Sequence, residues 1–254
     1  MRKILLSLML LVPLICRAEP IMVLYNASND TILEGDLLPV ANSIASISKL
    51  MTVYTVLQES QNLNENLTVT AKRLPNSHIS KGMTLTRRDL ITLALVSSDN
   101  LAAITLGENY PGGMERFVKK MNENAERLGM VNSGFVEPSG LDPMNYSSAP
   151  DIIALTQAVS KFPIVIEAAH TKQVSVKSKR GKRMLKVRCN PTSPFFGSKG
   201  IIAIKTGFTN AAGFCITMLV SAHNQLFSIV VLGAKTKNER KKFVEKSLKT
   251  IYRI

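Results

Sequence analysis

The chain has 254 residues, of which 45% are hydrophobic and 20% are charged, proportions that are typical of a folded protein. They exclude the disordered and low-complexity classes, which bury too little apolar surface to fold. The formal net charge of +14 favours anionic surroundings such as envelope polymers, anionic lipids or nucleic acid, although a basic surface without a dedicated partner explains it equally well.

The first eighteen residues have the layout of a secretory signal peptide. A basic start, Met1–Lys3, precedes an uncharged apolar run from Ile4 to Cys16, and a small-residue cleavage site ends at Ala18. The run is short for a membrane span. We therefore predict a signal peptide over residues 1–18 and one exported domain over 19–254, with a net charge of +11 after cleavage. Lipid anchoring at Cys16 is a minor alternative, because Ile15 precedes it where a small residue is needed.

The exported domain opens with two short segments of partly alternating hydrophobicity. Residues 21–27 and 31–37 are separated by a Ser-Asn-Asp spacer and predict a β-hairpin. From Ser46 the pattern changes, because apolar residues then recur at helical spacing from Leu50 to Leu57. This places Ser46 and Lys49 at the start of a half-buried helix.

The centre of the chain is predicted to be mostly helical. A Thr-x-x-Asp capping box at 86–89 opens a helix that reaches about residue 96, and residues 97–100 connect it to the next element. An apolar stripe over 114–128 predicts a helix that stops at Gly129. A second capping box, at 148–151, begins a helix that ends before Pro163. We therefore expect a helical lobe over roughly residues 60–165.

The C-terminal part returns to β-structure. Residues 201–206, 214–222 and 226–234 predict three antiparallel strands, and residues 239–252 predict a helix with one apolar and one basic face. We expect the apolar face to pack on the sheet; a helix lying on a membrane surface is the alternative. The whole order predicts an α+β fold in which both ends of the chain build one sheet around a helical insertion.

Two cysteines, Cys189 and Cys215, remain in the exported domain. An oxidising compartment permits them to pair, but buried free thiols are common and are the preferred interpretation. Neither belongs to a CxxC or Cys/His cluster, so we expect no metal site.

Three short motifs stand in sequence order: Ser46-Ile47-Ser48-Lys49, Ser98-Asp99-Asn100 and Lys205-Thr206-Gly207. Each is common alone, but the ordered set is specific to penicillin-binding proteins and serine β-lactamases. The spacing of the first motif puts its serine and lysine on one helix face, so the amine can reach the hydroxyl. Lysine can act as the general base only if burial and a neighbouring positive charge, here from Lys205, keep it neutral.

The other motif residues have matching chemistry. Ser98 can relay a proton to the leaving nitrogen, and the Asn100 amide can hold both the substrate backbone and the lysine amine. Thr206 offers a hydroxyl to a substrate carboxylate, while Gly207 lets the ligand lie against bare backbone. The N–H groups of the nucleophile and of Phe208 are expected to stabilise the oxyanion.

The segments around these motifs, 45–52, 97–103 and 205–213, resemble the low-molecular-mass penicillin-binding proteins, a family of serine D-alanyl-D-alanine peptidases. Within that family they look most like the D-alanyl-D-alanine endopeptidases of the penicillin-binding protein 7 type. Residues 110–113, 128–130 and 137–141 extend the resemblance over roughly residues 21–235. The sequence differs from the family's pattern at residues 189–192 and at Phe208, where many carboxypeptidases have histidine.

The resemblance implies a fold of the serine β-lactamase/DD-peptidase type, with a five-stranded antiparallel sheet and flanking helices beside an all-helical lobe, and the site between them. It implies a periplasmic serine DD-peptidase that hydrolyses D-alanyl bonds of peptidoglycan stem peptides, preferably in cross-links, and that penicillins acylate. No cofactor, no nucleic acid and at most peripheral membrane contact are expected.

Three alternative functions remain open at this stage. The first is a carboxypeptidase that trims pentapeptides. The second is a serine β-lactamase, for which Glu137 is the only candidate water-activating carboxylate. The third is a non-catalytic peptidoglycan-binding protein, which the complete set of motif residues disfavours.

Overall fold

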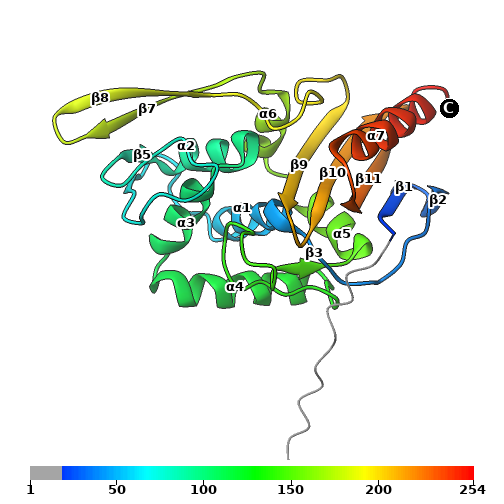
Figure 1. Cartoon of the computed structure of the whole chain (residues 1–254), viewed down its shortest axis with the longest axis horizontal. Coiled ribbons are helices and arrows are strands. Elements are labelled where there is room, and N and C mark those ends of the chain that lie inside the picture. Colours follow the sequence, from blue (N-terminus) through cyan, green and yellow to red (C-terminus); the bar gives the residue numbers. More distant parts are fainter. Residues whose placement is uncertain (1–18) are drawn as a thin grey trace, which may run out of the picture.

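The structure, a computed structural model, describes residues 19–254, so the predicted signal peptide lies outside the described residues and stays a prediction. A five-stranded antiparallel sheet with the order β2-β1-β11-β10-β9 is built from both ends of the chain (Figure 1). Its strands are β1 (Ile21–Asn26), β2 (Thr31–Glu34), β9 (Ile201–Thr209), β10 (Gly213–Ala222) and β11 (Gln225–Ala234).

Short turns and continuous runs of buried residues in the central strands set this sheet. The β10–β11 hairpin turns through His223 and Asn224, both with positive φ, as the tight hairpin turns that match strand twist require. Val23 of β1 pairs with Val230 of β11, and both are completely buried. The predicted N-terminal hairpin and C-terminal meander are therefore confirmed.

One of the seven α-helices in residues 19–254, α1, is central. Their bounds are α1 (Ser48–Gln58), α2 (Arg87–Thr92), α3 (Asn100–Glu108), α4 (Gly113–Arg127), α5 (Ala149–Val159), α6 (Pro163–His170) and α7 (Lys237–Ile251). Helix α1 contacts α3, α4 and α5, and α5 and α7 both pack on the sheet. Figure 1 shows α1 running through the middle of the molecule. The predicted caps at Thr86 and Ser148 are present, since each side chain accepts the expected N–H.

The structure adds strands that the sequence analysis did not predict. Residues 60–165 hold β4 (Asn66–Thr68), β5 (Thr84–Thr86) and β6 (Tyr146–Ser147) besides helices, and β6 pairs with β3 (Asn42–Ser43). A hairpin of β7 (Val174–Arg180) and β8 (Arg183–Cys189) completes a second sheet with the order β4-β5-β7-β8. The five-stranded sheet and α+β class are as predicted, but the predicted helical lobe also carries β-structure.

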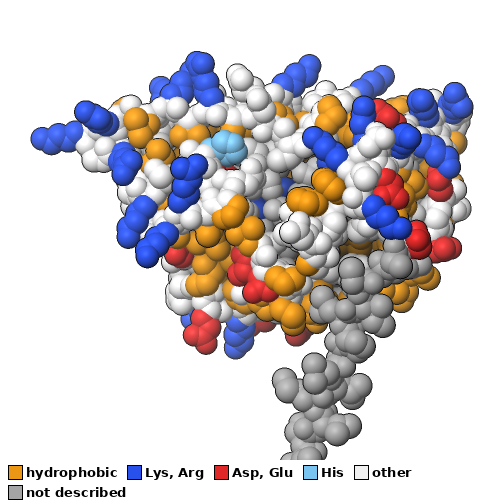
Figure 2. Space-filling model, viewed as in Figure 1, with side chains coloured by type: hydrophobic (Ala, Val, Ile, Leu, Met, Phe, Trp, Pro, Cys, Tyr) orange, Lys and Arg blue, Asp and Glu red, His pale blue; other side chains and the backbone are white. Residues whose placement is uncertain are grey.

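The β7–β8 hairpin extends away from the body and is strongly basic. Its seven lysines and arginines are Lys177, Lys179, Arg180, Lys182, Arg183, Lys186 and Arg188, and residues 171–200 contain no acid. Figure 2 shows basic side chains along this end of the molecule. The hairpin therefore concentrates part of the positive charge that the composition indicated.

The remaining expectations concern membranes and thiols. Within residues 19–254, no single helix is long and apolar enough to cross a membrane; α5 and α6 together have the length and composition, but they are bent by 103°. Cys189 and Cys215 are both free and buried, which confirms the preferred interpretation. Among the described residues, no three His, Cys, Asp or Glu side chains are grouped as a metal site would need.

Candidate active site

Ser46 lies in a short 3-10 turn, Ala45–Ile47, that leads directly into α1. Its side chain is half-buried, whereas Lys49, in the first turn of α1, is completely buried. The Lys49 Nζ atom lies 2.9 Å from Ser46 Oγ. The three-residue spacing therefore brings the amine to the hydroxyl, as the sequence indicated.

The Lys49 amine is held by two further acceptors. It donates to Asn100 Oδ1 at 2.6 Å and to the carbonyl oxygen of Ser139 at 2.5 Å. Burial lowers the pKa of Lys49 to about 7, while Glu137 and Asp99 oppose the shift. Burial, rather than the charge of Lys205 that the sequence analysis invoked, is therefore the cause of the low pKa.

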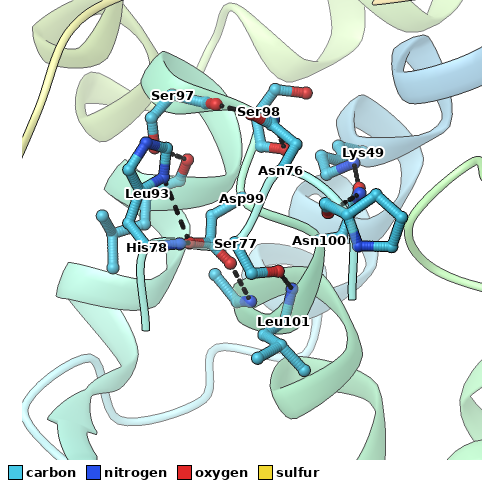
Figure 3. A network of polar contacts seen from close by, with 12 residues as sticks. Lys49, Asn76, Ser77, His78, Leu93, Ser97, Ser98, Asp99, Asn100 and Leu101 are labelled. Carbon is cyan, nitrogen blue, oxygen red and sulfur yellow. Dashed lines mark hydrogen bonds and ion pairs between the residues drawn. The ribbon is translucent and has the colours of Figure 1, made fainter. Parts of the chain in front are cut away.

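Ser98 lies in the link between the π-helical turn Leu93–Ser97 and α3, and Asn100 is the first residue of α3. Ser98 has a left-handed backbone, with φ of 58°, which ends the π-helical turn and turns the chain. Asp99 is completely buried and caps α3 by accepting the N–H of Ala102 at 2.9 Å. The same carboxylate accepts the His78 N–H at 2.5 Å (Figure 3). Asp99 thus fixes the link rather than facing a substrate.

A loop that the sequence did not indicate, residues 75–76, is hydrogen-bonded to this link and to Asn100. Asn76 Nδ2 donates to the carbonyls of Ser97 and Ser98, at 3.1 and 2.8 Å, as Figure 3 shows. In return, Asn100 Nδ2 donates to the Pro75 carbonyl at 2.6 Å. This bond fixes the orientation of the Asn100 amide and leaves its oxygen for Lys49.

The third motif lies on β9, an edge strand of the five-stranded sheet. Lys205 is completely buried, and its amine donates to Ser98 Oγ at 2.9 Å and to the Thr206 carbonyl at 2.8 Å. Burial, reinforced by Lys49 and Arg240, lowers its pKa well below the ordinary value. All three motifs therefore converge on one site.

Two glycines permit the close approach of the surrounding chain. A Cβ atom on Gly207 would lie 2.8 Å from the Ile44 carbonyl oxygen and 3.1 Å from the Ser46 nitrogen. Gly140 has φ of +78°, and a Cβ there would lie 1.9 Å from the Ala45 carbonyl oxygen. Only glycine lets β9 and the 137–141 loop pass so near the backbone of the nucleophile.

A cavity of about 340 Å³ opens over this site, hereafter the cleft. Six of the predicted site residues line it: Ser46, Ser98, Asn100, Thr206, Gly207 and Phe208. The other two, Lys49 and Lys205, lie completely buried next to it. The structure therefore brings all eight predicted residues together.

The cleft also has residues that the motifs did not reveal. Thr206 Oγ1 lies 2.6 Å from Thr192 Oγ1, in the segment where the resemblance fails. Phe208, half exposed, stacks on Phe214 with ring centroids 4.2 Å apart. Arg240, from α7, is 6% exposed and lines the same end of the cleft as a nearly buried cation. Nothing in the sequence around Arg240 indicates that its side chain lines the cleft.

The Glu137 carboxylate accepts hydrogen bonds from its own loop. Its carboxylate accepts the N–H of Ser139 at 2.6 Å and of Gly140 at 2.5 Å, and the Asn145 amide donates to it at 2.9 Å. The carboxylate therefore builds the turn that presents the Ser139 carbonyl to Lys49. This position is a structural one, unlike the water-activating position that the β-lactamase alternative needs.

The cleft combines the Ser46 hydroxyl next to a lysine amine of lowered pKa, a second buried amine that donates to Ser98, and the Arg240 guanidinium, which lines the same cavity as Thr206. Such a set can form and break an ester on the hydroxyl and can bind a carboxylate beside it.

The sequence model of a family described as D-alanyl-D-alanine carboxypeptidase matches residues 14–236. The D-alanyl-D-alanine endopeptidase of Escherichia coli strain K12 is 37% identical over 196 residues, which are 75% of this chain and 63% of the relative. The enzyme of the same name from Pseudomonas aeruginosa is 38% identical, with the same coverage. The chain thus spans about 63% of the length of these curated relatives.

Solved structures agree with the fold. The Listeria monocytogenes penicillin-binding protein D2, in an ampicillin-bound form, is 29% identical with a TM-score of 0.77, covering 91% of this chain and 96% of that one. The Streptomyces K15 DD-transpeptidase, 22% identical, has a TM-score of 0.84 and covers 92% of this chain and 97% of that one. This second likeness shows the fold alone.

Proposed function

Since the chain belongs to the D-alanyl-D-alanine carboxypeptidase family, we propose that it is a serine DD-peptidase that hydrolyses D-alanyl bonds of peptidoglycan stem peptides through an acyl-enzyme on Ser46. The observation that carries the proposal is the buried Lys49 amine, 2.9 Å from Ser46 Oγ and with its pKa lowered to about 7. At neutral pH a large fraction of such an amine is unprotonated. It can therefore take the proton of the hydroxyl as that oxygen attacks.

Lys49 is the general base in this proposal, and Asn100 is a positioning residue for it. The lone pair of the neutral amine must point at the Ser46 proton. The contacts to Asn100 Oδ1 and the Ser139 carbonyl use the N–H groups of the amine and leave this direction available. The motif asparagine acts here through the lysine.

The oxyanion of the tetrahedral intermediate forms beside the N–H groups of Ser46 and Phe208 in our proposal. Support comes from the close approach of β9 at Gly207 to the Ser46 nitrogen. Both groups are backbone donors on regular elements, so they are fixed before the reaction begins. The outer edge of β9 also has no strand partner among the described residues, so an extended peptide can add there as a further strand.

Ser98 returns a proton to the leaving nitrogen. Its hydroxyl accepts a hydrogen bond from Lys205 at 2.9 Å, so the Ser98 proton is free to point into the cleft. Once Ser98 gives up that proton, the Lys205 amine replaces it. Acylation thus breaks the peptide bond, forms the Ser46 ester and releases a neutral amine. Lys49 then loses the proton it took to solvent in the open cleft, and Lys205 regains one. Water next attacks the ester with the neutral Lys49 as base, and Lys49 passes that proton to Ser46 as the ester breaks.

Thr206 and the cations near it are proposed to bind the carboxylate that follows the scissile bond. Thr206 has its hydroxyl in the cleft, Arg240 supplies positive charge at this end, and the buried Lys205 amine lies next to Thr206. A D-alanyl-D-alanine terminus has its free carboxylate on the leaving residue, and a cross-link has an equivalent one beside its scissile bond. Either substrate therefore fits this end.

We favour the cross-link as substrate, because the two relatives at 37% and 38% identity are named endopeptidases. Trimming of pentapeptides remains the second candidate, since the bound carboxylate is common to both reactions. The β-lactamase alternative is disfavoured because Glu137 is engaged in its loop. Penicillins are expected to acylate Ser46, a proposal supported by the relative solved in its ampicillin-bound form.

Export to the periplasm is part of the same proposal. It rests on the signal-peptide layout of residues 1–18 and on the cell-wall bonds that the relatives' names describe. Nucleic acid is no proposed partner, and contact with membranes is at most peripheral.

The test is hydrolysis of defined muropeptides. Purified protein is incubated separately with cross-linked dimers and with pentapeptide monomers, and products are separated by chromatography. We expect dimers to be cut faster, with no reaction by Ser46→Ala. Trimmed monomers with intact dimers would reassign the protein as a carboxypeptidase, and inactivity on both would refute the peptidase.

A further inference from the structure

A second cavity, of about 510 Å³, adjoins the cleft and is called here the side groove. One wall is the segment of residues 193–195, and the other is the start of α7, with Lys237, Asn238, Arg240 and Lys241. Figure 1 shows α7 lying over β10 and β11, the two strands that it contacts. The groove is thus formed by two stretches that flank the same end of the sheet.

The cleft and the side groove are neighbours that share lining residues. Lys237 and Arg240 line both cavities. On the opposite wall, Thr192 lines the cleft and contacts Thr206, and the next residue, Ser193, already lines the side groove. The side groove therefore lies next to the end of the cleft that holds Thr206.

The side groove is cationic and partly apolar. Three of its lining side chains are basic, none is acidic, and Phe195 adds a half-buried ring. Lys241 has a partner, Glu245, at 3.5 Å. Lys237 has no carboxylate within 4.0 Å among residues 19–254, and Arg240 is nearly buried. The groove thus has positive charge that its own residues do not neutralise.

The chemistry of the scissile bond fixes which part of a substrate reaches this groove. The carboxylate near a D-alanyl bond belongs to the residue after the bond, so the end with Thr206 and Arg240 faces the leaving portion. When a pentapeptide is trimmed, that portion is a single residue. When a cross-link is cut, it is a whole stem peptide with further carboxylates.

We propose that the side groove binds the acidic stem peptide that leaves when a cross-link is cut, with Lys237 and Lys241 as specificity-determining residues. The inference rests on the proposed function and deepens it. It gives a structural reason for cutting cross-links in preference to trimming monomers, because only the cross-linked substrate is long enough to use both cavities. The partner chemistry is a peptide with several carboxylates, complementary to the basic lining of the groove and above all to Lys237, which has no carboxylate partner among residues 19–254.

The test compares two substrates in a paired variant. We expect Lys237→Gln/Lys241→Gln to lower kcat/KM for the cross-linked dimer by roughly five- to tenfold, as two exposed charge contacts allow, with a smaller effect on the pentapeptide. Lys242→Gln is the matched control, because Lys242 is an exposed lysine of α7 that lines neither cavity. It should change neither rate. Equal losses on both substrates, or no loss on the dimer, would overturn the proposal.

A binding measurement separates this inference from the proposed function. The dissociation constant of the cross-linked dimer is measured by calorimetry on Ser46→Ala protein, with and without the two glutamine substitutions. A dissociation constant that rises by roughly five- to tenfold with the two substitutions supports the groove even if the wild-type protein cuts nothing. Such inactivity would refute the peptidase alone. An unchanged constant, with active wild-type protein, would refute the groove alone.

Discussion

Acylation of Ser46 by a penicillin is expected to become about tenfold faster as the pH rises from 6 to 8. Only the unprotonated Lys49 amine can accept the Ser46 proton, and its pKa is about 7. The unprotonated fraction is then about one tenth at pH 6 and about nine tenths at pH 8. An ordinary lysine would leave under about 1% of the amine neutral throughout this range.

The assay is the second-order rate constant for labelling by a fluorescent penicillin, measured from pH 5.5 to 8.5 at constant ionic strength. The penicillin carboxylate titrates well below this range, so the titration belongs to the protein. Circular dichroism at each pH serves as the control for folding. A rate that is flat between pH 6 and 8, or that falls as the pH rises, would refute Lys49 as the base.

Three substitutions test the supporting structure. Lys49→Arg should slow acylation by roughly 10²–10⁴-fold, nearly as much as Lys49→Ala, because arginine stays protonated; near-normal labelling by the arginine variant would contradict this. Gly207→Ala places a Cβ 2.8 Å from the Ile44 carbonyl oxygen and should cost about 1–3 kcal/mol in thermal unfolding while slowing labelling; unchanged stability would show that β9 can move away. Asp99→Ala removes the buried acceptor of the Ala102 N–H and should cost about 1–3 kcal/mol in urea unfolding, so an unaltered midpoint would count against this cap.

The parts of the fold that the sequence predicted are those with local causes. The capping box at Thr86 and the stripe that ends at Gly129 act within one or two turns, so their helices form where the pattern places them. The contact between Lys49 and Ser46 follows from helix geometry in the same way. By contrast, the β7–β8 hairpin was missed because its apolar alternation is short: a buried serine, Ser178, takes the inward position that follows Val174 and Val176.

The unpredicted parts of the site come from residues distant in sequence. Asn76 acts on Ser98 from 22 positions away, and the Ser139 carbonyl reaches Lys49 from 90 positions away. No spacing rule connects such pairs, because loops and sheet order bring them together. Arg240 lines the cleft because α7 packs on β10 and β11, and the amphipathic pattern of the helix does not say which strands it covers.

The central claim is that Ser46 is the nucleophile, and intact-mass spectrometry after exposure to a penicillin tests it most directly. We predict one covalent adduct on the wild-type protein, located on Ser46 by peptide mapping, and none on a Ser46→Ala variant that keeps the circular dichroism of the wild type. An adduct that persists on Ser46→Ala, or one that maps to another residue of the wild-type protein, would contradict the account.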